Sequence, residues 1–188
     1  MFLSGPLMLE DRRLLWRLKR GDKDALRLVY EQYEGDLLTL AANLLHDPAT
    51  AEDVVQDVFI ALVRSVPRLE LRRTLRAYLA TAVANRVRDH YRRKSRASLV
   101  PLEDAGDVPA GCDGPVQMVI ASEQMQKLRS ALEELPYEQR EVIMLRTHAD
   151  MKFREIAEHQ NVTVKTALSR YQYGLNKLRS ILNGEVSK

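Results

Sequence analysis

The chain has 188 residues, of which 29 are Lys or Arg and 26 are Asp or Glu, so the formal net charge is +3. This length allows one medium domain or two small ones, and a hydrophobic content of 45% excludes a disordered or fibrous protein. The single cysteine, Cys112, cannot form an internal disulfide. No apolar run approaches the roughly 20 residues of a membrane span. We therefore expect neither membrane insertion nor a secretory signal.

The first half of the sequence predicts four helices. Apolar residues, Tyr30 among them, repeat with helical spacing over 10–33, and Asp22 is placed to cap the second of two helices in this stretch. The pattern continues to residue 45, and Pro48 suits the start of the third helix. The fourth helix is predicted over 75–91, with Tyr78 on its apolar stripe.

Positive charge is concentrated around this fourth helix. Residues 64–96 contain eleven Lys and Arg residues against two acidic ones, whereas residues 97–121 contain four acidic residues and no Lys or Arg. A concentrated basic block is typical of a surface that binds a polyanion, most commonly nucleic acid. The alternative is an ordinary solvated helix face.

The region after the basic block lacks periodicity and holds six of the chain's fifteen Pro and Gly residues. It predicts an acidic flexible linker over 97–118. The predicted fold class is therefore all-α, with two small helical domains joined by this linker. We refer to residues 10–96 as the N-terminal module and to residues 119–183 as the C-terminal module.

The end of the C-terminal module has the pattern of a helix-turn-helix. A short amphipathic helix over 153–159 is followed by Asn161, which tolerates the positive φ of a tight turn. Thr163 can cap the next helix, over 164–182, whose first turns carry short or cationic side chains. A generic helical hairpin is the alternative.

These stretches resemble a known family. Residues 132–142 (LEELPYEQREV), 153–157 (FREIA) and 163–170 (TVKTALSR) are similar to region 4 of a bacterial RNA polymerase sigma factor of the extracytoplasmic-function (ECF) group. Residues 51–59 (AEDVVQDVF) and 75–79 (LRAYL) are similar to region 2 of the same group. The two sets occur in the order and spacing that the family shows.

The resemblance implies a cytoplasmic, non-enzymatic promoter-specificity subunit that needs no metal or other cofactor. Its expected partners are the RNA polymerase core, through the coiled coil of the largest subunit and the flap region, promoter DNA, and an anti-sigma factor. Region 2 is expected to melt the minus-ten element, and region 4 to read the minus-35 element as duplex. The loop over 66–74 is expected to close over a flipped minus-ten base.

The resemblance also assigns site residues. The expected core polymerase-binding residues are Asp53, Gln56, Asp57 and Ile60. The expected minus-ten DNA-binding residues are Arg72, Arg73, Arg76, Asn85, Arg88, Arg92 and Arg93. The expected minus-35 DNA-binding residues are Arg146, Lys152, Lys165, Thr166, Ser169, Arg170 and Gln172.

The chain departs from the family pattern at a few positions. Tyr78 stands where the family usually has Trp, and Leu168 stands at an often basic position. Tyr173 and Gly174 replace a common Arg-Ala pair, and glycine costs a helix interior about 1 kcal/mol relative to alanine. We expect these changes to alter recognition of the minus-35 element.

Two other functions compete with the sigma-factor interpretation. The first is a free-standing helix-turn-helix regulator that does not bind polymerase. The second is a metal-dependent nucleic-acid enzyme using the carboxylates of Glu52, Asp53 and Asp57, although no histidine or second carboxylate motif accompanies them. The sigma-factor interpretation expects two separable bodies, one that binds polymerase and separates strands and one that reads intact duplex.

Overall fold

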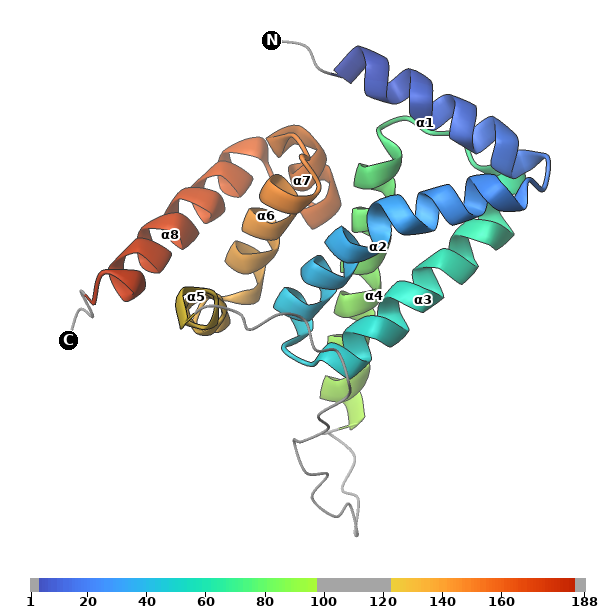
Figure 1. The fold of residues 1–188 in the computed structure, drawn as a ribbon. Coiled ribbons are helices and arrows are strands. Elements are labelled where there is room, and N and C mark those ends of the chain that lie inside the picture. Colours follow the sequence, from blue (N-terminus) through green and yellow to red (C-terminus); the bar gives the residue numbers. More distant parts are fainter. Residues whose placement is uncertain (1–3, 98–122, 185–188) are drawn as a thin grey trace, which may run out of the picture.

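The computed structural model describes residues 4–97 and 123–184. Within these ranges the regular elements are α-helices and one short 3-10 helix (Figure 1). Most of the predicted linker, with Cys112, lies outside the described residues. The elements are α1 (Ser4–Lys19), α2 (Lys23–Leu45), α3 (Pro48–Ser65), η1 (Val66–Arg68), α4 (Leu75–Ala97), α5 (Glu123–Glu133), α6 (Tyr137–His148), α7 (Phe153–Gln160) and α8 (Val164–Leu182).

Local sequence signals set the helix boundaries in the N-terminal module, which contains α1–α4. Asp22 caps α2, because its carboxylate accepts hydrogen bonds from the backbone N–H groups of Asp24 (2.9 Å) and Ala25 (3.1 Å). Pro48 occupies the first turn of α3, where its missing N–H leaves no hydrogen bond unmade. Both predicted boundaries are confirmed.

The core of the N-terminal module forms where apolar stripes of α1–α4 meet. Leu40, Leu62 and Leu79 are buried side chains from three of these helices. Tyr78 is half-buried and packs against this core, which confirms the packing predicted for it. Tyr30 was expected in the apolar stripe of α2, but 38% of it is exposed. It lies at the edge of the core, with its ring against Phe59 of α3.

The C-terminal module contains α5–α8 and has the predicted helix-turn-helix. Asn161 ends α7 with φ 54°, and the hydroxyl of Thr163 accepts a hydrogen bond from the backbone N–H of Thr166 at 3.1 Å. Ile156 and Ala157 of α7 are buried, as their spacing predicts. A Cβ on Gly174 would lie 2.8 Å from Cδ1 of Ile143, so glycine permits the close packing of α8 on α6.

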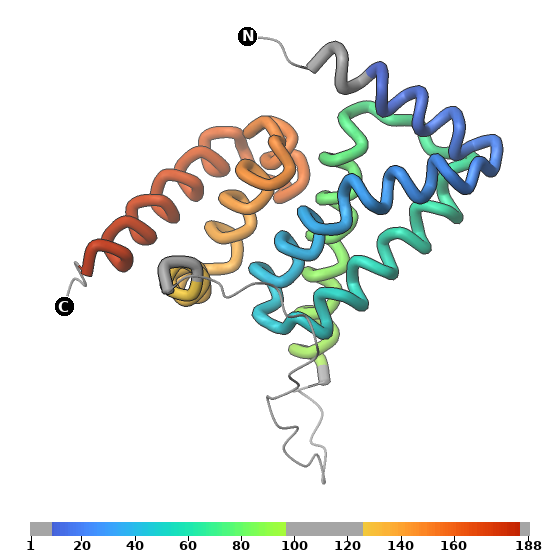
Figure 2. The backbone as a smooth tube through the Cα atoms, viewed as in Figure 1, coloured from blue at the N-terminus to red at the C-terminus, as the bar shows by residue number. Residues whose placement is uncertain are grey.

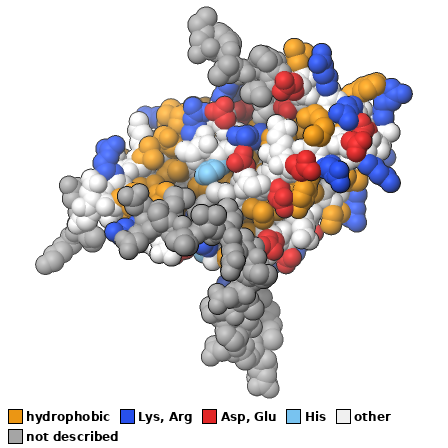
Figure 3. Space-filling model, in the orientation of Figure 1, with side chains coloured by type: hydrophobic (Ala, Val, Ile, Leu, Met, Phe, Trp, Pro, Cys, Tyr) orange, Lys and Arg blue, Asp and Glu red, His pale blue; other side chains and the backbone are white. Residues whose placement is uncertain are grey.

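The two modules lie in direct contact. Figures 1 and 2 show α6 alongside α2 and α4, with α8 on the side of the C-terminal module that faces away from the N-terminal module. The sequence predicted two modules, but it did not predict that they pack together. On the face shown in Figure 3, charged side chains of both signs intermingle over the N-terminal module, whereas hydrophobic side chains gather over the C-terminal module. Among the described helices, none has the length and apolar character needed to cross a bilayer.

Candidate functional site

The first set of predicted residues shares one face of α3. Asp53, Gln56, Asp57 and Ile60 are all exposed, while Val54, Val55 and Val58 are buried on the opposite face of the helix. Helical spacing explains the division, because residues three or four apart lie on the same side. The structure therefore brings this predicted set together on a single accessible surface.

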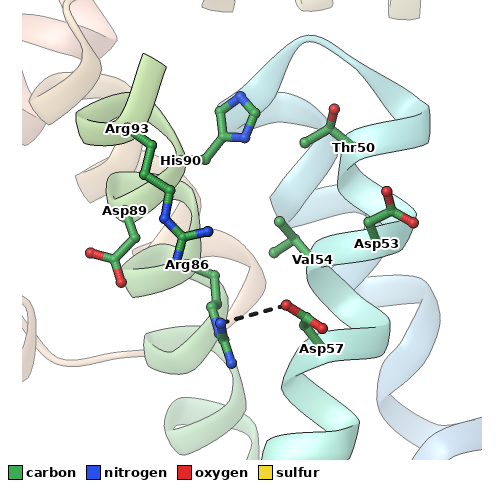
Figure 4. A pocket seen from close by; sticks show the side chains of 8 residues that line it. All are labelled: Thr50, Asp53, Val54, Asp57, Arg86, Asp89, His90 and Arg93. Atoms are coloured by element: carbon green, nitrogen blue, oxygen red, sulfur yellow. Dashed lines mark ion pairs between the residues drawn. The ribbon is translucent and has the colours of Figure 1, made fainter. Parts of the chain in front are cut away.

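A polar cleft of about 290 Å³ lies between α3 and α4, next to this surface (Figure 4). Asp53 and Asp57 line it from α3, and Arg86 and Arg93 line it from α4. An Arg86 guanidinium nitrogen lies 3.5 Å from a carboxylate oxygen of Asp57. Sequence reasoning did not single out Arg86, although it lies in the basic block. No cluster of His, Cys, Asp and Glu suited to a metal ion occurs among the described residues.

An apolar groove of about 420 Å³ lies on the same module, between α2 and α3. Leu26 and Tyr30 line it from α2, and Phe59, Ile60 and Val63 line it from α3. Half of Ile60 and half of Val63 remain exposed. Exposed apolar side chains grouped in this way are typical of a protein-binding surface. Of the residues that line this groove, only Ile60 was predicted as a site residue. Val63, an apolar residue one turn further along α3, was the sequence signal that could have indicated the rest of the groove.

The predicted minus-ten residues fall into two groups. Arg72, Asn85, Arg92 and Arg93 are exposed to solvent, and Arg92 pairs with Asp89 of its own helix at 2.7 Å. The other group, Arg73, Arg76 and Arg88, is directed toward the C-terminal module. The structure thus does not present all seven residues on one open surface.

The second group makes polar contacts with α6 and α7. Arg73 lies 3.9 Å from a carboxylate oxygen of Glu158. Arg76 donates to the backbone carbonyl of His148 at 3.5 Å and also pairs with Asp36 of α2 at 2.8 Å. Arg88 donates to the backbone carbonyl of His159 at 3.1 Å and to the carboxylate of Glu141.

Glu141 is the centre of a buried polar network. Its side chain is fully buried and accepts hydrogen bonds from Gln160 (2.8 Å) and Tyr137 (3.1 Å), with His159 Nε2 at 3.3 Å. Burial acts to raise the pKa of Glu141, but the hydrogen bond with His159 and the charge of Arg88 outweigh it, so the pKa lies below its ordinary value. Glu141 is therefore held as a carboxylate. The sequence offered no signal for this network.

The predicted minus-35 residues lie around the start of α8 and before α7. Lys165 and Gln172 are exposed, while Thr166, Ser169 and Arg170 are half-buried. Arg170 donates to the side-chain oxygen of Gln160 at 2.8 Å, so this cation is partly engaged within the module. The α8 face toward solvent has the form expected of a recognition helix.

Two more predicted residues, Arg146 and Lys152, flank the turn before α7. Lys152 is exposed. Arg146 donates to the backbone carbonyl of Met151 at 2.9 Å and lies over the Phe153 ring, 5.5 Å from its centre. The described contacts of Arg146 therefore stabilise the turn.

The departures from the family pattern have distinct structural settings. Tyr173 is 67% exposed. Its neighbour Tyr171, which is not one of these departures, packs edge-on against Phe153, with ring centres 5.2 Å apart. Leu168 is exposed on the solvent face of α8. An apolar residue at this position cannot supply the phosphate contact that a basic residue would make.

A helical module with a basic helix, joined to a helix-turn-helix module, defines a DNA-binding transcription protein. Comparison with family models matches residues 29–97 to sigma-70 region 2 and residues 125–178 to sigma-70 region 4. The chain belongs to the ECF group of the sigma-70 family. It is a non-enzymatic initiation factor that directs RNA polymerase to promoters, which rules out the free-standing regulator and the metal-dependent enzyme.

Individual relatives agree with this assignment. The chain is 30% identical to the RNA polymerase sigma factor CnrH of Cupriavidus metallidurans, over 95% of this chain and 97% of the relative. It is 25% identical to the ECF sigma factor SigW of Bacillus subtilis, over 91% and 96% of the two chains.

Two solved structures have a similar fold. CnrH in complex with the cytosolic domain of CnrY matches with a TM-score of 0.66 and 24% identity, covering 93% of this chain and 97% of CnrH. The sigma factor RpoE of Bartonella quintana, in complex with the anti-sigma factor NepR, matches with a TM-score of 0.62 and 25% identity. That match covers 88% of this chain and 98% of RpoE.

Proposed function

We propose that the exposed face of α3 binds the coiled coil of the largest polymerase subunit. Asp53, Gln56 and Asp57 would supply polar and acidic contacts to a basic partner surface, and Ile60 would supply an apolar one. The adjoining groove between α2 and α3 supports this assignment, because a partner helix could bury its exposed apolar side chains.

The basic helix α4 and the preceding loop bind and melt the minus-ten element. Arginines along the helix would neutralise the phosphates of the separated strand. Asn85 is exposed on the same helix, and its amide can both donate and accept a hydrogen bond with an extruded base. The proposed residues are Arg72, Arg73, Arg76, Asn85, Arg88, Arg92 and Arg93.

The C-terminal module reads the minus-35 element as duplex and contacts the polymerase flap. Lys165 and Gln172 are exposed on α8, and Thr166, Ser169 and Arg170 lie beside them. Short polar and cationic side chains at the start of a recognition helix suit contacts with base edges and phosphates. Lys152 and Arg146 complete the proposed set.

The proposed organisation follows the predicted boundaries, with modules over 10–96 and 119–183 and a linker over 97–118. An anti-sigma factor is a further proposed partner, by analogy with the relatives solved with CnrY and NepR. The proposed location is the cytoplasm, where RNA polymerase acts.

One observation supports the proposed polymerase-binding site: Asp53, Asp57 and Ile60 share a single exposed face of α3. The test is run-off transcription with core polymerase from the native host, together with a core-binding assay. We expect the D53K/D57K double variant to lose core binding and promoter-specific product. A matched double reversal, E134K/E138K, makes the same total change of charge at two exposed positions of the C-terminal module and should retain both. Unchanged core binding by D53K/D57K would overturn the proposed site.

A further inference from the structure

The first helix, α1, lies outside both regions that the family models match. The match to sigma-70 region 2 begins at residue 29, whereas α1 ends at Lys19. On the inner face of α1, Asp11, Leu15 and Leu18 are buried, each three or four residues from the next. The outer face of the helix is open to solvent, and none of the contacts proposed above uses it.

Trp16 stands at the centre of this outer face and is 58% exposed. Residues three and four positions away are the nearest neighbours of a side chain on a helix surface. At Trp16 all four of these neighbours are exposed and cationic: Arg12, Arg13, Lys19 and Arg20. The guanidinium of Arg20 lies over the indole ring, 4.5 Å from its centre. We refer to these five residues as the Trp16 patch.

The cations of the Trp16 patch are not neutralised within the fold. Among the residues that the structure describes, none of the four forms an ion pair with an acidic side chain. The neighbouring Arg17, by contrast, pairs with Asp22 at 2.7 Å. Like charges grouped on one helix repel one another, so binding of an anion would relieve this repulsion.

The helix that carries the patch borders the proposed minus-ten surface. Asp11 of α1 accepts a hydrogen bond from the backbone N–H of Leu75, the first residue of α4, at 2.7 Å. Figure 1 shows the segment between η1 and α4 passing beside α1. This segment carries Arg72, whose side chain is exposed. A strand that leaves the start of α4 therefore meets α1 next.

The composition of the patch favours single-stranded nucleic acid over a lipid or protein surface. An aromatic side chain among cations is typical of strand-binding sites, where a base stacks on the ring and the cations contact phosphates. A helix that lies on a membrane has a continuous apolar face, but among the described side chains of α1 the exposed large apolar ones are Leu9 and Trp16. A protein interface likewise has an apolar centre larger than one indole ring.

We propose that the Trp16 patch is a second strand-binding site, at which a base of single-stranded promoter DNA stacks on Trp16 and the surrounding cations contact the phosphates. The patch and α4 then hold the same strand at two points. The proposal rests on the proposed function for the source of this strand, which is the melted minus-ten element.

Tryptophan fluorescence tests the patch directly, because Trp16 is the single tryptophan of the chain. The probe is a single-stranded DNA of about 15 nucleotides and mixed sequence, added to the full chain, a length suited to one strand-binding module. We expect the strand to quench the emission, because a base stacks on the indole ring. The same sequence as a duplex should quench much less, because its bases are already stacked on one another.

Anisotropy of the same strand, labelled with fluorescein, measures the affinity of variants. Trp16→Ala should weaken binding about tenfold, whereas Trp16→Phe keeps a ring for stacking and should stay close to the parent chain. R12Q/R13Q should reduce the slope of log K against log salt by about 1.4, which is about 0.7 for each lost phosphate contact. The matched control, K127Q/R129Q, removes two exposed cations of α5 and should leave affinity and slope unchanged.

Several results would overturn the proposal. One is unchanged Trp16 emission when the strand is added, and another is parent-like affinity of Trp16→Ala. Equal quenching by polyglutamate at the same concentration of charge would indicate an acidic protein partner in place of DNA. A blue shift with vesicles of anionic phosphatidylglycerol, without quenching by DNA, would indicate a lipid surface.

The outcome is separable from that of the proposed function. R92A/R93A changes two arginines of α4 and should weaken strand binding, while the quenching at saturation persists. If this variant binds more weakly but the strand never alters Trp16 emission, the patch is refuted and the minus-ten assignment stands. If this variant keeps the parent affinity and the strand still quenches Trp16, the minus-ten assignment fails and the patch stands.

Discussion

The carboxylate of Asp11 accepts a hydrogen bond from the backbone N–H of Leu75 at 2.7 Å, although 64 residues separate the two in sequence. Leu75 is the first residue of α4, so Asp11 satisfies one of the N–H groups that a helix start leaves without an internal partner. Asp11 is 5% exposed and also accepts from the hydroxyl of Tyr33 at 3.2 Å. The first helix thereby fixes the end of the loop that precedes the basic helix.

We expect Asp11→Ala to lower the free energy of unfolding by about 2 kcal/mol, because it leaves two buried donors without an acceptor. Tyr33→Phe removes only the hydroxyl donor and should cost about 1 kcal/mol. Urea denaturation followed by circular dichroism measures both. Equal losses in the two variants would mean that the bond to Leu75 adds no stability.

Gly174→Ala is expected to lower the free energy of unfolding, although alanine is normally favoured over glycine inside a helix. The added Cβ would lie 2.8 Å from Cδ1 of Ile143, and overpacking of this kind outweighs the helix propensity gained, for a net loss of about 1 kcal/mol. Ile143→Val removes the overlapping methyl group. In that background Gly174→Ala should become neutral or stabilising, and a double-mutant cycle of urea midpoints measures the change of sign. A loss of the same size in both backgrounds would show that Ile143 is not the obstacle.

Two histidines at the interface between the modules make stability depend on pH. Burial lowers the pKa of His46, and the charge of Arg140 lowers it further, against the opposing charge of Glu133. Burial also lowers the pKa of His148, with Asp36 opposing and Arg76 adding to the shift. Both histidines therefore bind protons less readily in the folded chain than in the unfolded chain, where the ordinary pKa is 6.5.

The sign of the effect follows from this difference. The histidine contribution to stability is complete above pH 6.5 and decreases as the pH falls below that value, because protons then favour the unfolded chain. Urea unfolding at a series of pH values through this range measures the decrease. The H46Q/H148Q double variant, which has no imidazole to protonate at these positions, should show a smaller decrease. Identical pH profiles for the parent and the double variant would contradict the prediction.

Thr163 is expected to stabilise the start of the recognition helix. Its hydroxyl accepts from the backbone N–H of Thr166, so Thr163→Ala should cost about 1 kcal/mol of unfolding free energy. Thr163→Ser retains the acceptor and should lose much less. Urea denaturation of the two variants separates the hydrogen bond from the lost methyl group, and a loss as large in the serine variant would show that the cap is not responsible.

Much of the fold could be predicted from local signals. Asp22, Pro48, Asn161 and Thr163 each act on backbone groups within a few residues, so their capping and turn roles follow from the residue types alone. Helical periodicity likewise placed Asp53, Gln56 and Asp57 on one exposed face of α3. Tyr30 was placed wrongly, because periodicity identifies an apolar stripe but does not show where the core ends.

The helices, the two modules and the family could all be predicted, since each depends on neighbouring residues or on short motifs. How the modules meet could not be predicted in this way, because it depends on their packing in three dimensions. An arginine on a basic helix has the same local pattern whether it faces a phosphate or a carboxylate. Arg88 and Glu141 lie 53 residues apart, and only the packing of α6 against α4 joins them. The partner of a charged side chain depends on long-range contacts, which helix propensity and periodicity do not encode.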